Sequence, residues 1–287
     1  MQQKYTNLFI SLMIPCVLLG ISTWIDSYSG NSLPILTSCV VTTLFVHFIL
    51  GIPSVILKTE KIYDLTGSIA VWSMMITAAA LKTSLSSRAT LLMLMGCLWT
   101  TRLGAFLALR IHHHKVDRRF NQLKQQPINF ILAWAMSAAW TFVTLLSALT
   151  AIISDQQQAL YAIDYVFAIA WLMAFLMEAI ADWQKLSFKK KRQSTPFICS
   201  GLWYYSRHPN YFAEICMWFL VAGLAVPNLN VATSICLVSP LFVYWLLTSV
   251  SGVNLLEQAN DKKFGDLAAY KKYKSSTPCL IPNIWKR

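Results

Sequence analysis

The stretch SRHPNYFAEI, residues 206–215, gathers polar side chains at the start of an apolar run. Pro209 is best tolerated in or before the first turn of a helix, so a helix is predicted to begin at Asn210 and Tyr211. A helix start exposes unpaired amide groups and a partial positive charge, which favour a phosphate or a carboxylate. Arg207 adds a guanidinium that can hold the same anion through two hydrogen bonds. The motif therefore predicts an anion-binding helix start.

Neighbouring side chains could bind other groups of the same ligand. His208 can donate from one ring nitrogen, and Asn210 and Glu214 lie four residues apart, where they can bind amide, hydroxyl or amine groups. A plain polar collar at a membrane surface would favour Arg or Lys here over this combination. Upstream, FKKKR at 188–192 is typical of a loop on the positive side of a membrane, although Lys189 could hold a further phosphate beside an anion site.

Other ionisable residues fall within apolar stretches, where their cost in lipid marks them as candidate site residues. Glu178 and Asp182 lie four residues apart and share one helix face, so they need a positive or hydrogen-bonding partner opposite. The alternative is a solvated pair at the membrane interface. Arg102 lies too deep in its stretch to reach the headgroups easily, and Asp64 or Glu178 could be its partner. A structural ion pair and a substrate contact both remain open for Arg102.

The composition places these residues in a membrane protein. Of the 287 residues, 56% are hydrophobic and 13% are charged, whereas soluble domains carry roughly 25% charged residues. A helix needs about 20 apolar residues to cross a bilayer, so the apolar stretches predict an all-α, polytopic transmembrane bundle of seven or eight helices. The expected spans are 8–25, 33–57, 65–81, 90–109, 128–153, 160–181, 211–226 and 231–250.

The basic residues predict the orientation of this bundle. With the N-terminus placed inside, only Lys82 and Arg88 of the 24 Lys and Arg residues fall in outside loops, and Arg102 falls within a span. Basic loops favour the cytoplasmic side, so both termini and the working face are expected there. The net charge of +12 then reflects this rule and attraction to anionic membrane lipids, not nucleic acid. The long cytoplasmic segments would be 110–127, 182–210 and 251–287.

The cysteines and histidines predict no metal site. None of the seven cysteines forms a Cys-x-x-Cys pair, and no His stands at zinc-ligand spacing from them, so free thiols are expected. His112–His114 are consecutive and would point in three directions on a helix, which suits an interfacial collar better than one shared ion. The apolar run within 1–25 has no small-residue cleavage site after it and is predicted to be a retained first helix.

Six segments of the chain share one resemblance: EKIYDLTGS, WTTRLGAFLALR, DRRF, EAIADWQKLSFK, GLWYYSRHPNYFAEI, and SGVNLLEQ with the downstream FGDLAAYKKYKSSTPCLIPNIW. Together they resemble the steroid 5α-reductase C-terminal domain superfamily, which also contains isoprenylcysteine and phospholipid methyltransferases. The resemblance is to its bacterial-type branch of uncharacterised membrane reductase-like proteins, designated DUF1295. It covers about 60–285 and suggests N-terminal transmembrane helices at 1–59 followed by a reductase-like membrane domain at 60–287.

The resemblance implies an NADPH pocket within the membrane domain that opens to the cytoplasm. On that template, Glu178 and Asp182 would contact the nicotinamide ribose or amide region, while Lys189 and Arg207 would meet phosphates. Tyr273 and the LIP tail would help to close the site. The remaining cofactor-binding residues would be Tyr204, His208, Asn210, Tyr211, Glu214 and Tyr270.

The implied reaction is hydride transfer from NADPH to an activated carbon–carbon double bond in a lipid or steroid-like substrate, with an acid polarising the conjugated carbonyl. Asp64 is the candidate acid. Trp99 stands where the steroid enzymes carry a Tyr, and because an indole cannot deliver a proton usefully, a 3-keto-steroid substrate is not favoured. Tyr63 could compensate. An apolar substrate would enter from the bilayer among the first four helices and contact Trp99 and Arg102. Short loops favour a bacterial inner membrane.

Two alternatives remain open. Methyl transfer from S-adenosylmethionine also uses an RHPxY turn, but Ala213 stands where those enzymes favour Gly, and Glu257-Gln258 replaces their usual pair of glutamates. A non-catalytic membrane scaffold would leave the inward carboxylates and Arg102 without a role. Nucleotide binding distinguishes the scaffold from both enzymes, and the nucleotide that binds distinguishes the enzymes from each other.

Overall fold

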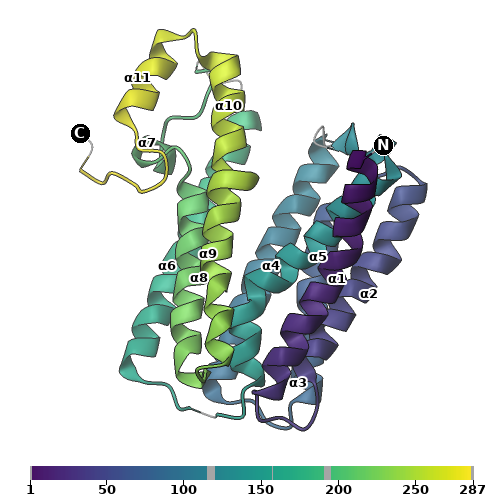
Figure 1. Ribbon diagram of the computed structural model, residues 1–287. Coiled ribbons are helices and arrows are strands. Elements are labelled where there is room, and N and C mark those ends of the chain that lie inside the picture. Colours follow the sequence, from purple (N-terminus) through teal and green to yellow (C-terminus); the bar gives the residue numbers. More distant parts are fainter. Residues whose placement is uncertain (1, 115–119, 157, 191–194, 286–287) are drawn as a thin grey trace. The chain divides into compact units, whose positions relative to one another are not determined.

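The computed structural model describes residues 2–114, 120–156, 158–190 and 195–285, and these contain helices and connecting segments but no strand (Figure 1). Eight of the helical segments are long and apolar enough to cross a membrane. The expected all-α, polytopic architecture is confirmed. The eight spans are Gln2–Ser27, Ile35–Ile56, Tyr63–Leu81, Ser87–Leu109, Pro127–Ile153, Ala162–Lys189, Pro209–Asn228 and Thr233–Phe264.

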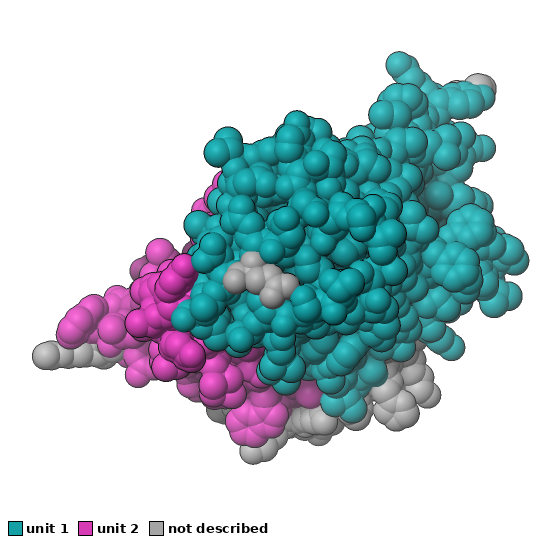
Figure 2. Space-filling model, turned by 90° about the horizontal axis from the view of Figure 1, so that it is seen from below, with its two compact units in different colours: residues 1–160, 224–239 teal, residues 161–223, 240–287 magenta. Residues whose placement is uncertain are grey.

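The chain forms two compact units, coloured separately in Figure 2. Unit 1 comprises Met1–Leu160 with Leu224–Ser239, and unit 2 comprises Tyr161–Gly223 with Pro240–Arg287. This division rests on packing and does not test the expected sequence boundary between 59 and 60, which stays a prediction. The helices of unit 1 are α1 (Gln2–Ser27), α2 (Ile35–Ile56), α3 (Tyr63–Leu81), α4 (Ser87–His114), η2 (Leu123–Gln125), α5 (Pro127–Ile153), η3 (Val226–Asn228) and η4 (Thr233–Leu237).

Helix α5 is the centre of unit 1. It packs against α1, α2, α3 and α4, and 78% of its most apolar 18-residue segment is buried. Phe142, Leu145 and Leu149 are fully buried, whereas α2 exposes large apolar side chains such as Phe45 and Phe48. An apolar helix surrounded by other helices, and outer helices with exposed apolar side chains, are what a protein folded in lipid requires.

Polar side chains satisfy the helix ends in unit 1. Asp26, at the end of α1, accepts hydrogen bonds from the amides of Leu36 (2.9 Å) and Thr37 (2.8 Å) in the first turn of α2. These amides have no partner within their own helix, so Asp26 acts as a cap supplied by the preceding helix. Arg88 is fully buried and donates to the carbonyl oxygens of Ala159 and Leu224, both at 2.9 Å. Its guanidinium therefore has a structural role.

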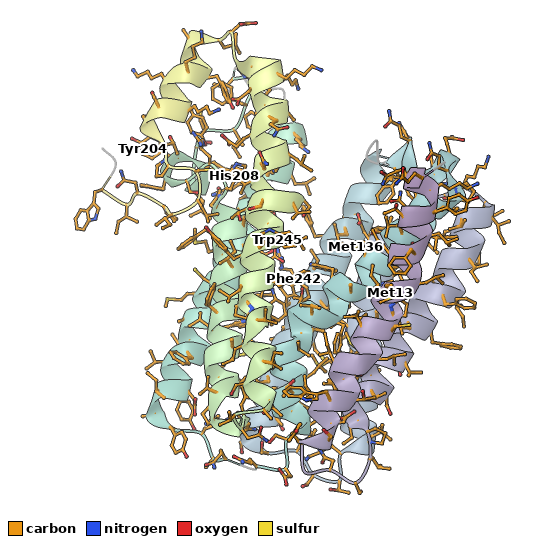
Figure 3. The ribbon with its side chains drawn as sticks, viewed as in Figure 1. Met13, Met136, Tyr204, His208, Phe242 and Trp245 are labelled. Carbon is orange, nitrogen blue, oxygen red and sulfur yellow. The ribbon has the colours of Figure 1, made fainter. Side chains whose placement is uncertain are left out.

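Unit 2 carries the SRHPNYFAEI motif. Its helices are α6 (Ala162–Lys190), α7 (Leu202–Tyr205), most of α8 (Pro209–Ala225), most of α9 (Val238–Trp245), a π-helical turn η5 (Leu246–Val250), α10 (Val253–Phe264) and α11 (Ala268–Ser276). Figure 3 shows Tyr204 on α7 and His208 at the start of α8. The motif and the polar C-terminal segment thus belong to the same compact unit.

Two helices extend further than the sequence analysis expected. Helix α6 continues to Lys190, and its extra turns support α7: the Leu202 amide donates to Gln184 Oε1 at 3.0 Å, and Lys185 lies 4.9 Å from the Trp203 ring centre. The last span continues through η5 to Phe264. Its 32 residues would measure roughly 48 Å at about 1.5 Å per residue, more than a bilayer core of about 30 Å. Part of α10 therefore lies beyond the apolar core.

Candidate functional site

The predicted helix start is confirmed, because α8 begins at Pro209. The turn before it is held by the C-terminal tail of the chain. The Arg207 amide donates to the Pro278 carbonyl oxygen at 3.0 Å, and the Ser206 hydroxyl donates to the Leu280 carbonyl oxygen at 2.7 Å. Ser206 also accepts from the His208 amide at 3.1 Å. These bonds fix the backbone that presents Arg207 and His208.

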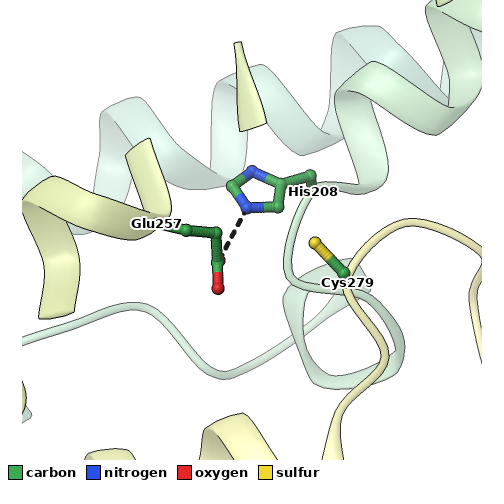
Figure 4. Close-up of side chains that lie close together, drawn as sticks. All are labelled: His208, Glu257 and Cys279. Atoms are coloured by element: carbon green, nitrogen blue, oxygen red, sulfur yellow. Dashed lines mark hydrogen bonds and ion pairs between the residues drawn. The ribbon is translucent and has the colours of Figure 1, made fainter. Parts of the chain in front are cut away.

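A charge network joins this turn to α10 and α11. His208 Nε2 lies 2.8 Å from Glu257 Oε1 (Figure 4), and Arg207 Nη2 lies 3.1 Å from Glu257 Oε2. Arg207 Nη1 also donates to the Lys274 carbonyl oxygen at 2.8 Å. The Lys274 ammonium lies 2.6 Å from both carboxylate oxygens of Asp261. The network pairs two cationic side chains with two carboxylates, and it holds three separate chain segments together.

Two tyrosines close the base of this network. The Tyr270 hydroxyl donates to Asp261 Oδ1 at 3.0 Å, and the Tyr273 hydroxyl donates to the Trp203 carbonyl oxygen at 2.6 Å. Burial, followed by the hydrogen bond to Asp261, raises the pKa of Tyr270 above its usual value, and burial also raises the pKa of Tyr273. Both phenols therefore stay protonated at neutral pH, where they act as hydrogen-bond donors and not as bases.

A pocket of about 430 Å³ opens beside the network. Three of the side chains around it are basic, and Tyr270 and Ser275 add hydroxyl groups. The complete lining is Arg207, Asp261, Gly265, Tyr270, Lys271, Lys274 and Ser275. Two lysines and an arginine around one concave surface favour an anionic ligand such as a phosphate.

Three residues of the helix start have buried side-chain atoms without a hydrogen-bond partner among the described residues. These atoms are Arg207 Nε, His208 Nδ1 and Asn210 Oδ1. Buried polar atoms in folded proteins are nearly always paired, so three exceptions within four positions require an explanation. A bound ligand that supplies the missing partners is one such explanation, and the arrangement fits the anion site predicted from sequence.

The paired carboxylates of α6 lie in the same unit. Glu178 is 3% exposed and Asp182 is 7% exposed, which confirms that both face the protein interior and excludes the alternative of a solvated pair. Asp182 Oδ1 accepts a hydrogen bond from Asn210 Nδ2 at 3.1 Å. Asn210, in the first turn of α8, is therefore one hydrogen-bonding partner of the carboxylate pair on α6. This bond leaves the Asn210 amide oxygen, which has no partner among the described residues, able to accept from a ligand.

The remaining cofactor candidates are distributed around the helix start. The Tyr211 ring stacks parallel to the His208 ring, with centroids 5.8 Å apart. Tyr204 is half-buried on α7, Glu214 is half-buried one turn into α8, and Lys189 is exposed at the end of α6. Arg192, in the basic run after Lys189, lies outside the described residues.

The candidate catalytic and substrate residues belong to unit 1. The Tyr63 hydroxyl donates to the Ala133 carbonyl oxygen at 2.8 Å, and its ring packs against Phe120 and Trp134. This bond gives Tyr63 a structural role between α3 and α5. Asp64 is half-buried in the first turn of α3.

Trp99 and Arg102 lie on α4 of unit 1. Trp99 is buried with its ring 6.1 Å from that of Trp140, and Arg102 is half-buried. Their substrate contacts stay predictions, as do the catalytic roles of Tyr63 and Asp64. The side chains of His112–His114 lie outside the described part of the chain.

Sequence reasoning missed several members of the network. Glu257 was weighed only as half of a methyltransferase motif, and Asp261 and Lys274 look like ordinary surface charges in sequence. Cys279 looked like an isolated thiol, yet its sulfur, one His208 ring nitrogen and a Glu257 carboxylate oxygen all lie within 4.8 Å of one another. All seven cysteines are free, as expected. The only sequence signal for the contact between Glu257 and the RHP turn was the LLEQ motif downstream of RHPNY.

The eight apolar helices make this protein a polytopic integral membrane protein. Among protein-family models, the one for the family described as protein of unknown function DUF1295 matches residues 47–277. The chain belongs to that family, which confirms the resemblance at this level. No curated protein and no solved structure matches it.

Proposed function

We propose that this protein is a membrane-embedded, NADPH-dependent reductase of an activated carbon–carbon double bond in a lipid or steroid-like substrate. The observation that carries the proposal is the set of buried side-chain atoms of Arg207, His208 and Asn210 that lack a partner among the described residues. Arg207 also lines the basic pocket. The resemblance of the sequence motifs to steroid 5α-reductases suggests the reaction type. The geometry supports the more general part of the proposal, a nucleotide-like anionic cofactor.

The chemistry of these residues fits a phosphorylated nicotinamide cofactor. Arg207 Nε and His208 Nδ1 can bind oxygen atoms, while Asn210 Oδ1 can accept from a carboxamide or a hydroxyl group. Lys271 and Lys274 suit phosphate oxygens. The pocket volume of about 430 Å³ falls within the roughly 300–1,000 Å³ usual for ligand sites, which is enough room for a phosphorylated portion of such a cofactor.

In the proposed complex, the side chains around the site bind different parts of the cofactor. The bound cofactor supplies a hydride to the substrate. Arg207 and Lys271 neutralise phosphate charge, and Asn210, oriented by its bond to Asp182, holds the neutral polar part of the cofactor. Tyr270 remains protonated and, through Asp261, keeps Lys274 in place.

The substrate half of the proposal rests on unit 1. Asp64 is the proposed acid with Tyr63 as the alternative, and Trp99 and Arg102 would contact the apolar substrate. The basic loops support an orientation in which the termini and the cofactor site face the cytoplasm, and the short loops favour a bacterial inner membrane.

Thermal unfolding of the purified protein in detergent tests the cofactor. NADPH, NADP, NADH and S-adenosylmethionine are titrated separately, because a ligand that binds only the folded state raises the unfolding temperature in a saturable way. We expect a saturable rise with NADPH and NADP, and a smaller rise or none with NADH. A rise only with S-adenosylmethionine overturns the reductase proposal, and no rise with any of the four favours a scaffold.

Methyl transfer is the second candidate, and one observation favours it. Glu257, the residue shared with the methyltransferase motif, contacts both Arg207 and His208 of the RHP turn. A carboxylate at that place could hold the amino group of S-adenosylmethionine. We rank it second because the pocket itself carries more basic than acidic side chains.

A further inference from the structure

Three chain segments that are distant in sequence bring metal-binding atoms to one point. His208 precedes α8, Glu257 lies on α10 and Cys279 lies in the C-terminal tail (Figure 4). One potential ligand atom from each lies within 4.8 Å of the other two. Imidazole nitrogen, carboxylate oxygen and thiolate sulfur together are a ligand set that zinc accepts.

We propose that His208, Glu257 and Cys279 bind a divalent cation of the zinc class, with an open fourth coordination position. Three protein ligands with one open position are typical of zinc sites that also bind water or a substrate. Tetrahedral coordination would separate the ligand atoms by about 3.4–3.6 Å. The His208–Glu257 distance of 2.8 Å must lengthen for this, and the Cys279 sulfur already lies within 4.8 Å of both other ligand atoms.

The surroundings hold each ligand in place. Arg207 binds Glu257 through Oε2, which leaves Oε1 directed at His208. Such a second partner for a ligating carboxylate is usual at metal sites. Cys279 is flanked by hydrogen bonds from the Arg207 amide to Pro278 and from Ser206 to Leu280, so its backbone is fixed on both sides.

The local charges permit a cation despite the nearby basic residues. Lys274 is paired with both oxygens of Asp261 at 2.6 Å and lies farther, 3.8 Å, from Glu257 Oε2, and the charge of Arg207 is offset by Glu257. A thiolate at Cys279 would then add the negative charge that partly balances the metal. His208 is 2% exposed, and Glu257 and Cys279 are half-buried, so charge interactions among the ligands are stronger than in bulk water.

The metal and the proposed cofactor use different atoms of His208. The metal takes Nε2, which leaves the proton on Nδ1, the buried atom without a described partner. That Nδ1–H is free to donate to a cofactor oxygen or to water. Metal binding and nucleotide binding can therefore be tested separately, and one can fail without the other.

Cobalt titration of the metal-stripped, full-length protein in detergent tests the site. Thiolate coordination to Co²⁺ produces a strong charge-transfer absorption in the near ultraviolet, and tetrahedral geometry intensifies the visible bands. We expect one equivalent of Co²⁺ to bind, zinc to displace it, and the near-ultraviolet band to vanish in Cys279→Ser. Cys199→Ser, a half-buried cysteine of the same unit outside the cluster, should keep the band.

A second variant and a second measurement keep the proposal testable if Cys279→Ser does not fold. Glu257→Gln should weaken Co²⁺ binding by about 10- to 100-fold while retaining the thiolate band at saturation. In the wild-type protein, zinc should protect Cys279 from alkylation, measured by mass spectrometry, and should leave Cys199 unprotected. The proposal is wrong if the wild-type protein gives no thiolate band, if the band persists in Cys279→Ser, or if zinc leaves Cys279 as reactive as before.

Discussion

His208 Nε2 and Glu257 Oε1 lie 2.8 Å apart, and this contact ties the first turn of α8 to α10. The same carboxylate contacts Arg207, so a single side chain orients both residues of the RHP turn. The proposed cofactor and the proposed metal each depend on that orientation.

Glu257→Ala should destabilise unit 2, because it leaves Arg207 and His208 without their shared acceptor. Glu257 is only 15% exposed in its side chain, so we expect a loss of about 1–3 kcal/mol in the free energy of unfolding. Chemical denaturation in detergent measures it. The neighbouring, exposed Gln258 is the control, and Gln258→Ala should change stability by less than about 0.5 kcal/mol. Equal effects would contradict the network.

Lys271→Gln should weaken NADPH binding, because Lys271 lines the pocket and its charge suits a phosphate. A lost charge-assisted contact of about 1.5–3 kcal/mol corresponds to a decrease in affinity of roughly ten- to hundredfold. Lys272 is the matched control: it is adjacent, exposed and outside the pocket lining. Lys272→Gln should leave affinity nearly unchanged at moderate salt. If both variants bind NADPH alike, the phosphate does not occupy this pocket.

Arg207→Ala should also weaken dinucleotide binding by about ten- to hundredfold, since it removes a guanidinium next to the proposed phosphate position. Arg207 also binds Glu257 and the Lys274 carbonyl oxygen. The free energy of unfolding of the Arg207→Ala protein must therefore be measured together with its affinity. Arg207→Lys retains the charge but not the two-pronged geometry, and an intermediate affinity is expected. Unchanged affinity in Arg207→Ala would remove this residue from the cofactor site.

Tyr270 should make stability fall at alkaline pH. Its pKa is raised in the folded protein, so its contribution is complete below the unfolded value of 10.0 and is lost as pH rises toward the higher folded value. Tyr270→Phe should reduce the slope of unfolding free energy above pH 10 by up to roughly 1.4 kcal/mol per pH unit. Denaturation at several pH values measures the slope. An identical slope in both proteins would contradict the buried phenol–carboxylate bond.

The membrane helices could be predicted from sequence because their signal is local. Apolar runs gave eight spans, and the ring of Pro209 fixed the start of α8. The sequence analysis ended the last span at 250 because the residues beyond are more polar, whereas the structure continues after a two-residue bend at Ser251 and Gly252 into α10.

The site could be predicted only in part. Arg207, His208 and Asn210 were found because they are neighbours in sequence. Glu257 and Cys279 reach His208 through the packing of α10 and the tail, and no sequence spacing encodes those contacts.

Calorimetric titration of NADPH into the purified protein tests the central claim most directly, because it measures whether the site at the start of α8 binds the cofactor at all. We predict a saturable isotherm with one site per chain, weakened in Lys271→Gln and retained in Lys272→Gln. The absence of saturable binding by a folded wild-type protein would contradict the account.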